Sequence, residues 1–125
     1  MKDDHISLGQ LGENLACDYL AEKRYKILSR NFRRPWGEID IVARARDGTL
    51  VFFEVKTMRD FGDGGLRPED QMSSAKLRKL RRTCAAYCAE RPEDVYEERG
   101  WRIDVLAISM PNNTDARSVR QYENI

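Results

Sequence analysis

The chain has 125 residues, of which 41% are hydrophobic and 34% are charged, and its net charge is +1. This composition predicts one folded domain, and the balance of charges excludes a disordered polyelectrolyte and a uniformly basic protein. No apolar run is long enough to span a membrane, and residues 1–10 lack the apolar core of a secretory signal. Three cysteines, an odd number, argue against a closed disulfide framework. We therefore expect a single domain over residues 1–125, without a membrane partner, in the reducing cytoplasm.

The first predicted element is a helix that begins after Ser7. Ser7 and Gln10 have the spacing of a capping box, in which each side chain binds a backbone N–H group at the start of the helix. Two stripes follow at helical spacing. Leu8, Leu11, Leu15 and Tyr19 form one stripe, and Glu13, Ala16, Cys17 and Leu20 form the other.

Three strands are predicted next, over Tyr25–Phe32, Glu38–Ala45 and Leu50–Lys56. Pro35-Trp36-Gly37 separates the first two strands, and a turn at Asp47-Gly48 separates the last two. Alternation in the second strand places Ile39, Ile41 and Ala43 on one face. Glu38, Asp40 and Val42 lie on the opposite face. In the third strand alternation separates Val51, Phe53, Val55 from Phe52, Glu54, Lys56.

The second half of the chain predicts a loop, a helix and one or two strands. Residues 57–68 contain three glycines and are expected to form a mobile loop that closes over a substrate. A helix over Glu69–Arg91 and a strand over Trp101–Ile108 follow, with a weak strand over Val119–Ile125. The order αβββαβ predicts an α/β fold, in which an antiparallel meander and a helical crossover build a mixed central sheet flanked by helices.

The turn between the second and third strands decides which acids face each other. A two-residue turn would place Asp40 opposite Val55, whereas a three-residue turn over 46–48 would place it opposite Glu54. We favour the three-residue turn, with Gly48 in the left-handed conformation, because it keeps both hydrophobic faces intact. Ile41 then pairs with Phe53, Val42 with Phe52 and Ala43 with Val51.

Facing carboxylates repel each other, and a divalent cation between them would remove that cost. Hard oxygen ligands suit Mg or Mn, so we expect such a cation at Asp40 and Glu54. Lys56 beside it would polarise an attacking water or neutralise charge on a phosphate. The alternative is that these acids and lysines are ordinary solvent-facing positions of an amphipathic sheet.

A set of motifs extends over most of the chain. It consists of Gly37-Glu38-Ile39-Asp40 and Phe53-Glu54-Val55-Lys56, together with Gly12-Glu13, Arg30-Asn31 and Lys76. In this respect the sequence resembles the YraN-like family of uncharacterised bacterial proteins, which is similar to Holliday-junction resolvases and other PD-(D/E)XK nucleases. The resemblance implies a restriction-endonuclease-like core and a metal-dependent endonuclease for structured or branched nucleic acid. It assigns catalytic roles to Asp40, Glu54 and Lys56, and suggests Glu13 as a further acid. Ile39 stands where the superfamily pattern has proline, as is usual among resolvase-like relatives.

Cations are concentrated in the second predicted helix. Lys76, Arg78, Lys79, Arg81 and Arg82 lie within seven residues, and Arg33 and Arg34 precede the second strand. They predict a phosphate-binding surface, with DNA favoured over RNA, or alternatively a solvated face. Trp36 is a candidate to stack on an unpaired base, or a packing residue.

Three functional classes therefore remain open from the sequence. The first is a nuclease, for which a homodimer would supply the two sites that a junction-cutting enzyme needs. The second is a non-catalytic nucleic-acid-binding module on a nuclease-like scaffold. The third is a protein-interaction domain in which the acids are merely surface groups.

Overall fold

The computed structural model describes residues 7–58, 72–109 and 118–125. Within them, the elements in chain order are α1 (Leu8–Glu22), β1 (Lys26–Arg34), β2 (Gly37–Arg44), β3 (Leu50–Met58), α2 (Ser74–Glu90), η2 (Pro92–Asp94), β4 (Trp101–Ser109) and β5 (Ser118–Tyr122). The predicted order is confirmed, and the C-terminal strand that the sequence indicated only weakly is formed. Thr57 and Met58 belong to β3, and the rest of the predicted lid lies outside the described residues.

Both helices begin at a capping serine. The Ser7 hydroxyl accepts the Gln10 amide at 3.1 Å, and the Ser73 hydroxyl accepts the Lys76 amide at 3.1 Å. The Gln10 side chain binds Asn14 instead of closing the predicted capping box. The second helix was predicted from Glu69, but it begins at Ser74, where Ser73 supplies the cap; residues 69–71 lie outside the described residues.

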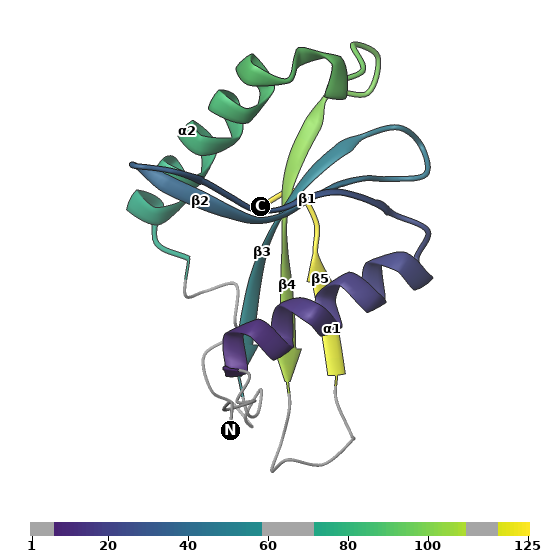
Figure 1. The fold of residues 1–125 in the computed structure, drawn as a ribbon, viewed down its shortest axis with the longest axis vertical. Helices are drawn as coiled ribbons and strands as arrows, with labels where there is room; N and C mark the ends of the chain where they lie inside the picture. Colours follow the sequence, from purple (N-terminus) through teal and green to yellow (C-terminus); the bar gives the residue numbers. More distant parts are fainter. Residues whose placement is uncertain (1–6, 59–71, 110–117) are drawn as a thin grey trace, which may run out of the picture.

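The sheet contains five strands in the order β1-β2-β3-β4-β5, as Figure 1 shows. Strands β1, β2 and β3 form the predicted antiparallel meander. Helix α2 then crosses over and returns the chain to β4, which pairs in parallel with β3. Strand β5 closes the other edge in antiparallel orientation. The predicted mixed sheet is therefore confirmed, and β3 lies at its centre.

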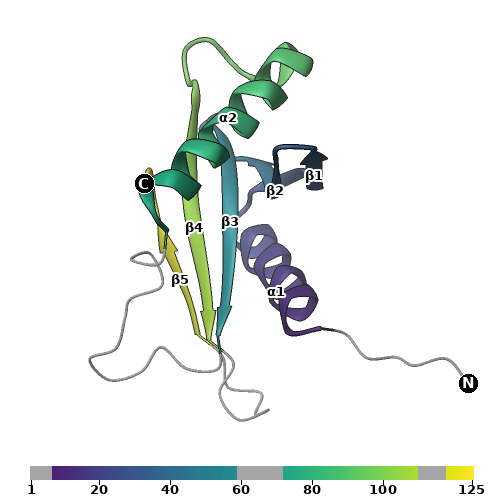
Figure 2. The same cartoon turned by 90° about the vertical axis from the view of Figure 1, so that its left-hand side faces the viewer.

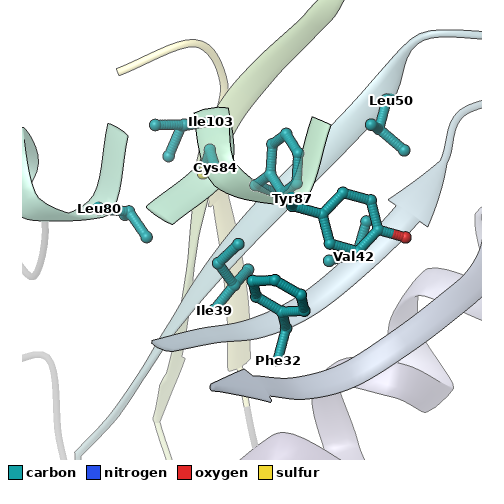
Figure 3. Close-up of a cluster of buried hydrophobic side chains, with 9 residues drawn as sticks. Phe32, Ile39, Val42, Leu50, Leu80, Cys84, Tyr87 and Ile103 are labelled. Atoms are coloured by element: carbon teal, nitrogen blue, oxygen red, sulfur yellow. The ribbon is translucent and has the colours of Figure 1, made fainter. Parts of the chain in front are cut away.

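The two helices cover different halves of the sheet (Figures 1 and 2) and bury different sets of side chains. Leu80, Cys84 and Tyr87 of α2 pack on the set shown in Figure 3, here called the α2-side cluster: Phe32, Ile39, Val42, Leu50, Phe52 and Ile103. Ala16 and Leu20 of α1 pack on the α1-side cluster: Ile41, Ala43, Val51, Phe53, Leu106 and Ile108. Alternate residues of β3 enter the two clusters, so the clusters lie on opposite faces of the sheet.

The buried face of α1 is not the more apolar of its two predicted stripes. Leu8 and Leu11 remain exposed, whereas Ala16 and Leu20 of the second stripe are completely buried. Gly12 lies on the same buried face, where an added Cβ atom would stand 1.9 Å from Thr57 Oγ1 of β3. The first half of the helix therefore approaches the sheet through the small Gly12 and Ala16, while Leu8 and Leu11 face outward.

The hairpin between β2 and β3 has the predicted three-residue turn. Ile41 pairs with Phe53, Val42 with Phe52 and Ala43 with Val51. The Gly48 amide donates to the Ala45 carbonyl at 2.9 Å, and Gly48 has φ 98°, a left-handed conformation that favours glycine. This register sets the positions of the acids further along both strands.

Side chains of β1 and β2 exchange faces at Asn31 and Asp40, which the register places opposite each other. Arg30 reaches α1, whereas Phe32, two residues later, packs in the α2-side cluster. Asn31 between them has φ 53°, and this left-handed residue breaks the alternation. The expectation that Ile39 shares a face with Ile41 and Ala43 is therefore wrong, because Ile39 follows Phe32 into the α2-side cluster.

Among the described residues, no helix is long and apolar enough to cross a membrane.

The close approach of α1 to β3 predicts opposite effects for two glycines of one helix. Gly12→Ala should lower the free energy of unfolding by about 1–3 kcal/mol, because the new methyl group overlaps Thr57. Gly9→Ala is the matched control, since no described atom lies within 4 Å of its Cβ position. It should raise stability by up to about 1 kcal/mol. Urea denaturation of both variants makes the comparison, and equal stabilities would contradict the packing described for α1.

Candidate active site

Strands β2 and β3 stop pairing at Asp40. Their ladder runs from Arg44–Leu50 to Ile41–Phe53 and ends there. If the ladder continued, the Val55 amide would donate to the Ile39 carbonyl, because the pairs that exchange hydrogen bonds alternate along the strands. Instead the Val55 amide donates to Asp40 Oδ2 at 2.7 Å. A side-chain carboxylate thus takes the place of a backbone acceptor, and the two strands separate into a fork.

The fork is flanked by two hollows. The α1 hollow, of about 330 Å³, is lined by Glu13, Asn31, Glu38, Asp40 and Thr57, among others. The α2 hollow, of about 220 Å³, is lined by Trp36, Glu38, Glu54, Lys76 and Lys79, among others. Glu38 lines both hollows, so they meet at the edge of the fork.

The predicted direct pairing of Asp40 with Glu54 is not formed. The ladder ends one pair earlier, and the face exchange carries Asp40 to the α1 hollow while Glu54 lines the α2 hollow. The charge of Glu54 nevertheless acts on Asp40. Burial raises the pKa of Asp40, and the negative charge of Glu54 raises it further, to about 7, against the opposing hydrogen bond from Val55. The two carboxylates therefore interact electrostatically across the fork, and not as neighbours on a shared face.

Glu54 is held between two lysines. Its Oε2 atom lies 3.0 Å from Lys76 Nζ and 3.6 Å from Lys56 Nζ. Glu54 and Lys56 share a face of β3, as predicted. Burial lowers the pKa of Lys56, as does its contact with Lys76, while Glu54 opposes the change. A hydrogen bond with Lys56 raises the pKa of Lys76, and the charges on Glu54 and Asp40 add to this against the effect of burial.

Glu13 is buried, and its carboxylate is paired with two residues of β1. Its Oε1 atom accepts Arg30 Nη2 at 3.1 Å, Arg30 Nε at 3.2 Å and Asn31 Nδ2 at 2.9 Å. The carboxylate lines the α1 hollow with Asp40 and contributes to raising the pKa of Asp40 after burial and Glu54. The charged partner of Glu13 is Arg30.

The cations of α2 do not all turn toward the α2 hollow. Lys76 and Lys79 line it. Arg81 donates to the Ile125 carbonyl, the Arg82 guanidinium lies 5.7 Å from the centre of the Trp36 ring, and Arg78 is exposed. Arg33 lines the α1 hollow and forms an ion pair with Glu38 at 2.9 Å. Trp36, 40% exposed, therefore stands on the rim of the α2 hollow with a cation beside it.

Two contacts at this site were not predicted. Sequence reasoning named Lys76 as a motif residue and as a member of a basic run, but not as the ion-pair partner of Glu54 that it is. It also missed that Arg30 and Asn31 hold Glu13. The motif residues Arg30-Asn31 and Gly12-Glu13 carried this second signal, but spacing in the sequence did not show that the two pairs meet.

The fold and the site define an α/β protein whose acids and lysines gather at a fork in a mixed sheet. The pattern of the Uncharacterised protein family UPF0102 matches residues 12–108, and the chain belongs to this family. A relative from Syntrophotalea carbinolica is 42% identical over 108 residues, which cover 86% of this chain and 83% of the relative. A relative from Roseiflexus castenholzii is 44% identical over 103 residues, which cover 82% and 79%. The resemblance to YraN-like proteins is thereby confirmed.

Two solved structures resemble this chain at low sequence identity. A repair endonuclease from Pyrococcus abyssi has 19% identity and a TM-score of 0.47, over 90% of this chain and 42% of that protein. The EndoMS–dsDNA2 complex has 16% identity and a TM-score of 0.44, over 82% of this chain and 37% of that protein. This chain spans less than half the length of either protein.

The raised pKa of Asp40 predicts that the metal-free protein loses folding stability as pH rises. An unfolded aspartate titrates near its ordinary value of 3.8, whereas folded Asp40 titrates near 7. The folded state therefore holds the proton more tightly, and its stability falls as pH rises from about 4 to about 7. Asp40→Asn removes this loss and keeps an oxygen for the Val55 amide. With a chelator present, urea denaturation should give a higher free energy of unfolding for the variant than for the wild type. This difference should be larger at about pH 8 than at about pH 5. A difference independent of pH would contradict the described environment of Asp40.

Proposed function

We propose that this protein is a metal-dependent endonuclease that cleaves phosphodiester bonds in structured or branched nucleic acid. The observation that carries the proposal is that the negative charge of Glu54, which also pairs with Lys56, acts on the buried Asp40 at the fork. Perturbed carboxylates and lysines that converge beside surface hollows are typical of active sites. The proposal covers residues 1–125 as a single nuclease-like domain.

The donor set fits Mg or Mn. Within the described residues no three metal-ligating side chains gather into a cage, and Mg commonly takes only one or two carboxylates, with water and substrate phosphate as its other ligands. Asp40 and Glu54 would supply the two carboxylates. Burial and the negative charge of Glu54 already raise the pKa of Asp40, so a cation would favour the charged form that the metal-free site disfavours. Such a cation, when bound, lowers the pKa of coordinated water and offsets charge on the scissile phosphate.

The side chains of the protein would divide the remaining work. Lys56, whose side chain is 16% exposed, lies beside Glu54 and would stabilise the negative charge that builds up on the phosphate. Its lowered pKa also suits it to accept a proton from an attacking water. Glu13 would act only through the electrostatic effect of its negative charge on Asp40, because Arg30 and Asn31 bind its carboxylate.

The basic residues near the α2 hollow would bind the nucleic-acid backbone. Lys79 lines the hollow, and Arg82 stands with Trp36 on its rim, where the indole would stack on an unpaired base. Arg78 and Arg33 are exposed and would add phosphate contacts, and Lys76 is discussed below. We propose DNA over RNA, and a homodimer for a substrate that needs two cuts. A cytoplasmic location is proposed because Cys17, Cys84 and Cys88 are all free thiols.

A second candidate function is a nucleic-acid-binding module that uses the same surface but does not cleave its ligand. Glu54 is neutralised by two lysines, as it would be in a permanently inactive nucleic-acid-binding module. A protein-interaction domain is less well supported, because it gives no role to the carboxylate charges at the fork.

Cleavage of a substrate panel in Mn²⁺ distinguishes the nuclease from the binding module. The panel contains single strands, duplexes, forks, four-way junctions and RNA. Asp40→Asn, Glu54→Gln and Lys56→Ala should each lose at least about a hundredfold in rate, since each removes charge from the reacting centre. Glu38→Gln is the matched control, because Glu38 lines both hollows but is paired with Arg33. If the wild type cuts nothing and binds Mn²⁺ no better than Asp40→Asn, the binding-module function replaces the nuclease.

Salt dependence of binding tests the proposed phosphate contacts. Alanine at both Lys79 and Arg82 should reduce the slope of log affinity against log salt by about 2, one unit for each lost contact. Alanine at both Arg46 and Arg99 removes the same charge near the turn between β2 and β3, away from the fork, and should leave the slope nearly unchanged. Equal reductions in the two double variants would show that only net charge matters.

A further inference from the structure

Lys76 occupies an unfavourable place for a cation. It lies in the first turn of α2, where the Ser73 cap binds the Lys76 amide. The start of a helix carries partial positive charge, so a lysine there is repelled, and the first turn Ser74-Ala75-Lys76-Leu77 has no acid to offset it. The ammonium instead reaches Glu54, whose Oε2 atom lies 3.0 Å from Lys76 Nζ. The contact with Glu54, and not the helix, accounts for the position of this charge.

The charges at the fork are balanced without any metal. Lys56 and Lys76 carry two positive charges, and Glu54 and Asp40 can carry two negative ones. A divalent cation that arrives at the two carboxylates must therefore meet a lysine already in place. The Lys56 side chain is 16% exposed, whereas that of Lys76 is 46% exposed and rises from the edge of the α2 hollow. Lys76 is thus the lysine that can leave at little cost.

We propose that Lys76 is a displaceable counter-ion, which neutralises Glu54 in the metal-free protein and gives up this carboxylate when a divalent cation binds. The inference rests on the proposed function, since it assumes that Glu54 is a metal ligand. Once released, the Lys76 ammonium remains in the α2 hollow beside Lys79, where a substrate phosphate would take the place of Glu54 as its partner. Metal and polyanion would then bind with mutual reinforcement, because each favours the same position of Lys76.

Lys79 provides a matched control for this role. It lines the same hollow, lies one helical turn from Lys76 and carries the same charge. In the described part of the chain, its ammonium forms no ion pair. Removal of Lys79 changes the electrostatic potential of the hollow without freeing Glu54, so the two lysines separate a general charge effect from a specific one.

The experiment measures Mn²⁺ affinity of the full chain by calorimetry, without nucleic acid. Lys76→Met should bind Mn²⁺ roughly fivefold more tightly than the wild type, because the metal no longer competes with a partly exposed ion pair. Lys79→Met should change the affinity by less than about twofold, since exposed charges at this separation are screened. Lys76→Arg should stay close to the wild type, because the competing cation is retained.

A second readout follows the lysine itself. Acetylation of the wild type, read by mass spectrometry, should increase at Lys76 when Mn²⁺ is added, because the amine leaves its ion pair. The extent of modification at Lys79 should stay constant. This readout requires no substitution and is therefore independent of any effect of a variant on folding.

The outcomes separate this inference from the proposed function. Equal Mn²⁺ affinities in the wild type and Lys76→Met, or equal gains in Lys76→Met and Lys79→Met, would overturn the role of Lys76 while leaving the metal site in place. If none of the proteins binds Mn²⁺, the metal site itself is rejected, and the inference falls with it.

Discussion

The hydrogen bond from the Val55 amide to the Asp40 carboxylate stands where strands β2 and β3 stop pairing. A backbone amide at this depth needs an acceptor, and a side chain supplies it in place of the neighbouring strand. The strands are therefore free to diverge without leaving this amide unpaired. The face exchange at Asn31 turns Asp40 toward α1, while Glu54 of β3 faces α2, so the two hollows lie on either side of this bond.

The fork also concentrates charge that the rest of the fold must offset. Asp40, Glu54 and Glu13 come from three different elements, and each is only partly accessible to water. Arg30 and Asn31 neutralise Glu13, and the two lysines neutralise Glu54. Among the described residues, Asp40 accepts only the Val55 amide, and burial together with the charge of Glu54 outweighs this bond and raises the pKa of Asp40 to about 7. This distribution of partners leaves Asp40 as the carboxylate with most to gain from a cation.

Much of the framework could be predicted because it depends on neighbouring residues. The Ser7 cap, the turn at Gly48 and the register from Ile41 to Ala43 are all encoded within a few positions.

Sequence reasoning was insufficient where residues far apart in the chain determine which side chains are buried. Helix α1 buries Glu13, not Leu11, because Arg30 and Asn31 of β1 supply partners for the acid and Gly12 permits close approach to Thr57. The face exchange at Asn31 has only a weak local signal, the tolerance of asparagine for left-handed conformations. We extended the alternation past this residue and so placed Asp40 and Glu54 on one face. The two carboxylates in fact lie toward opposite faces and interact across the fork.

The central claim is that Asp40 and Glu54, which line separate hollows, share one divalent cation. Anomalous diffraction from Mn²⁺-soaked crystals tests it directly, because it locates the metal without reference to activity. The account predicts one peak at the fork, about 2.1 Å from an oxygen of each carboxylate, with the Lys76 ammonium moved away from Glu54. A peak bound to only one of the two carboxylates, or Mn²⁺ found only elsewhere on the protein, would contradict it.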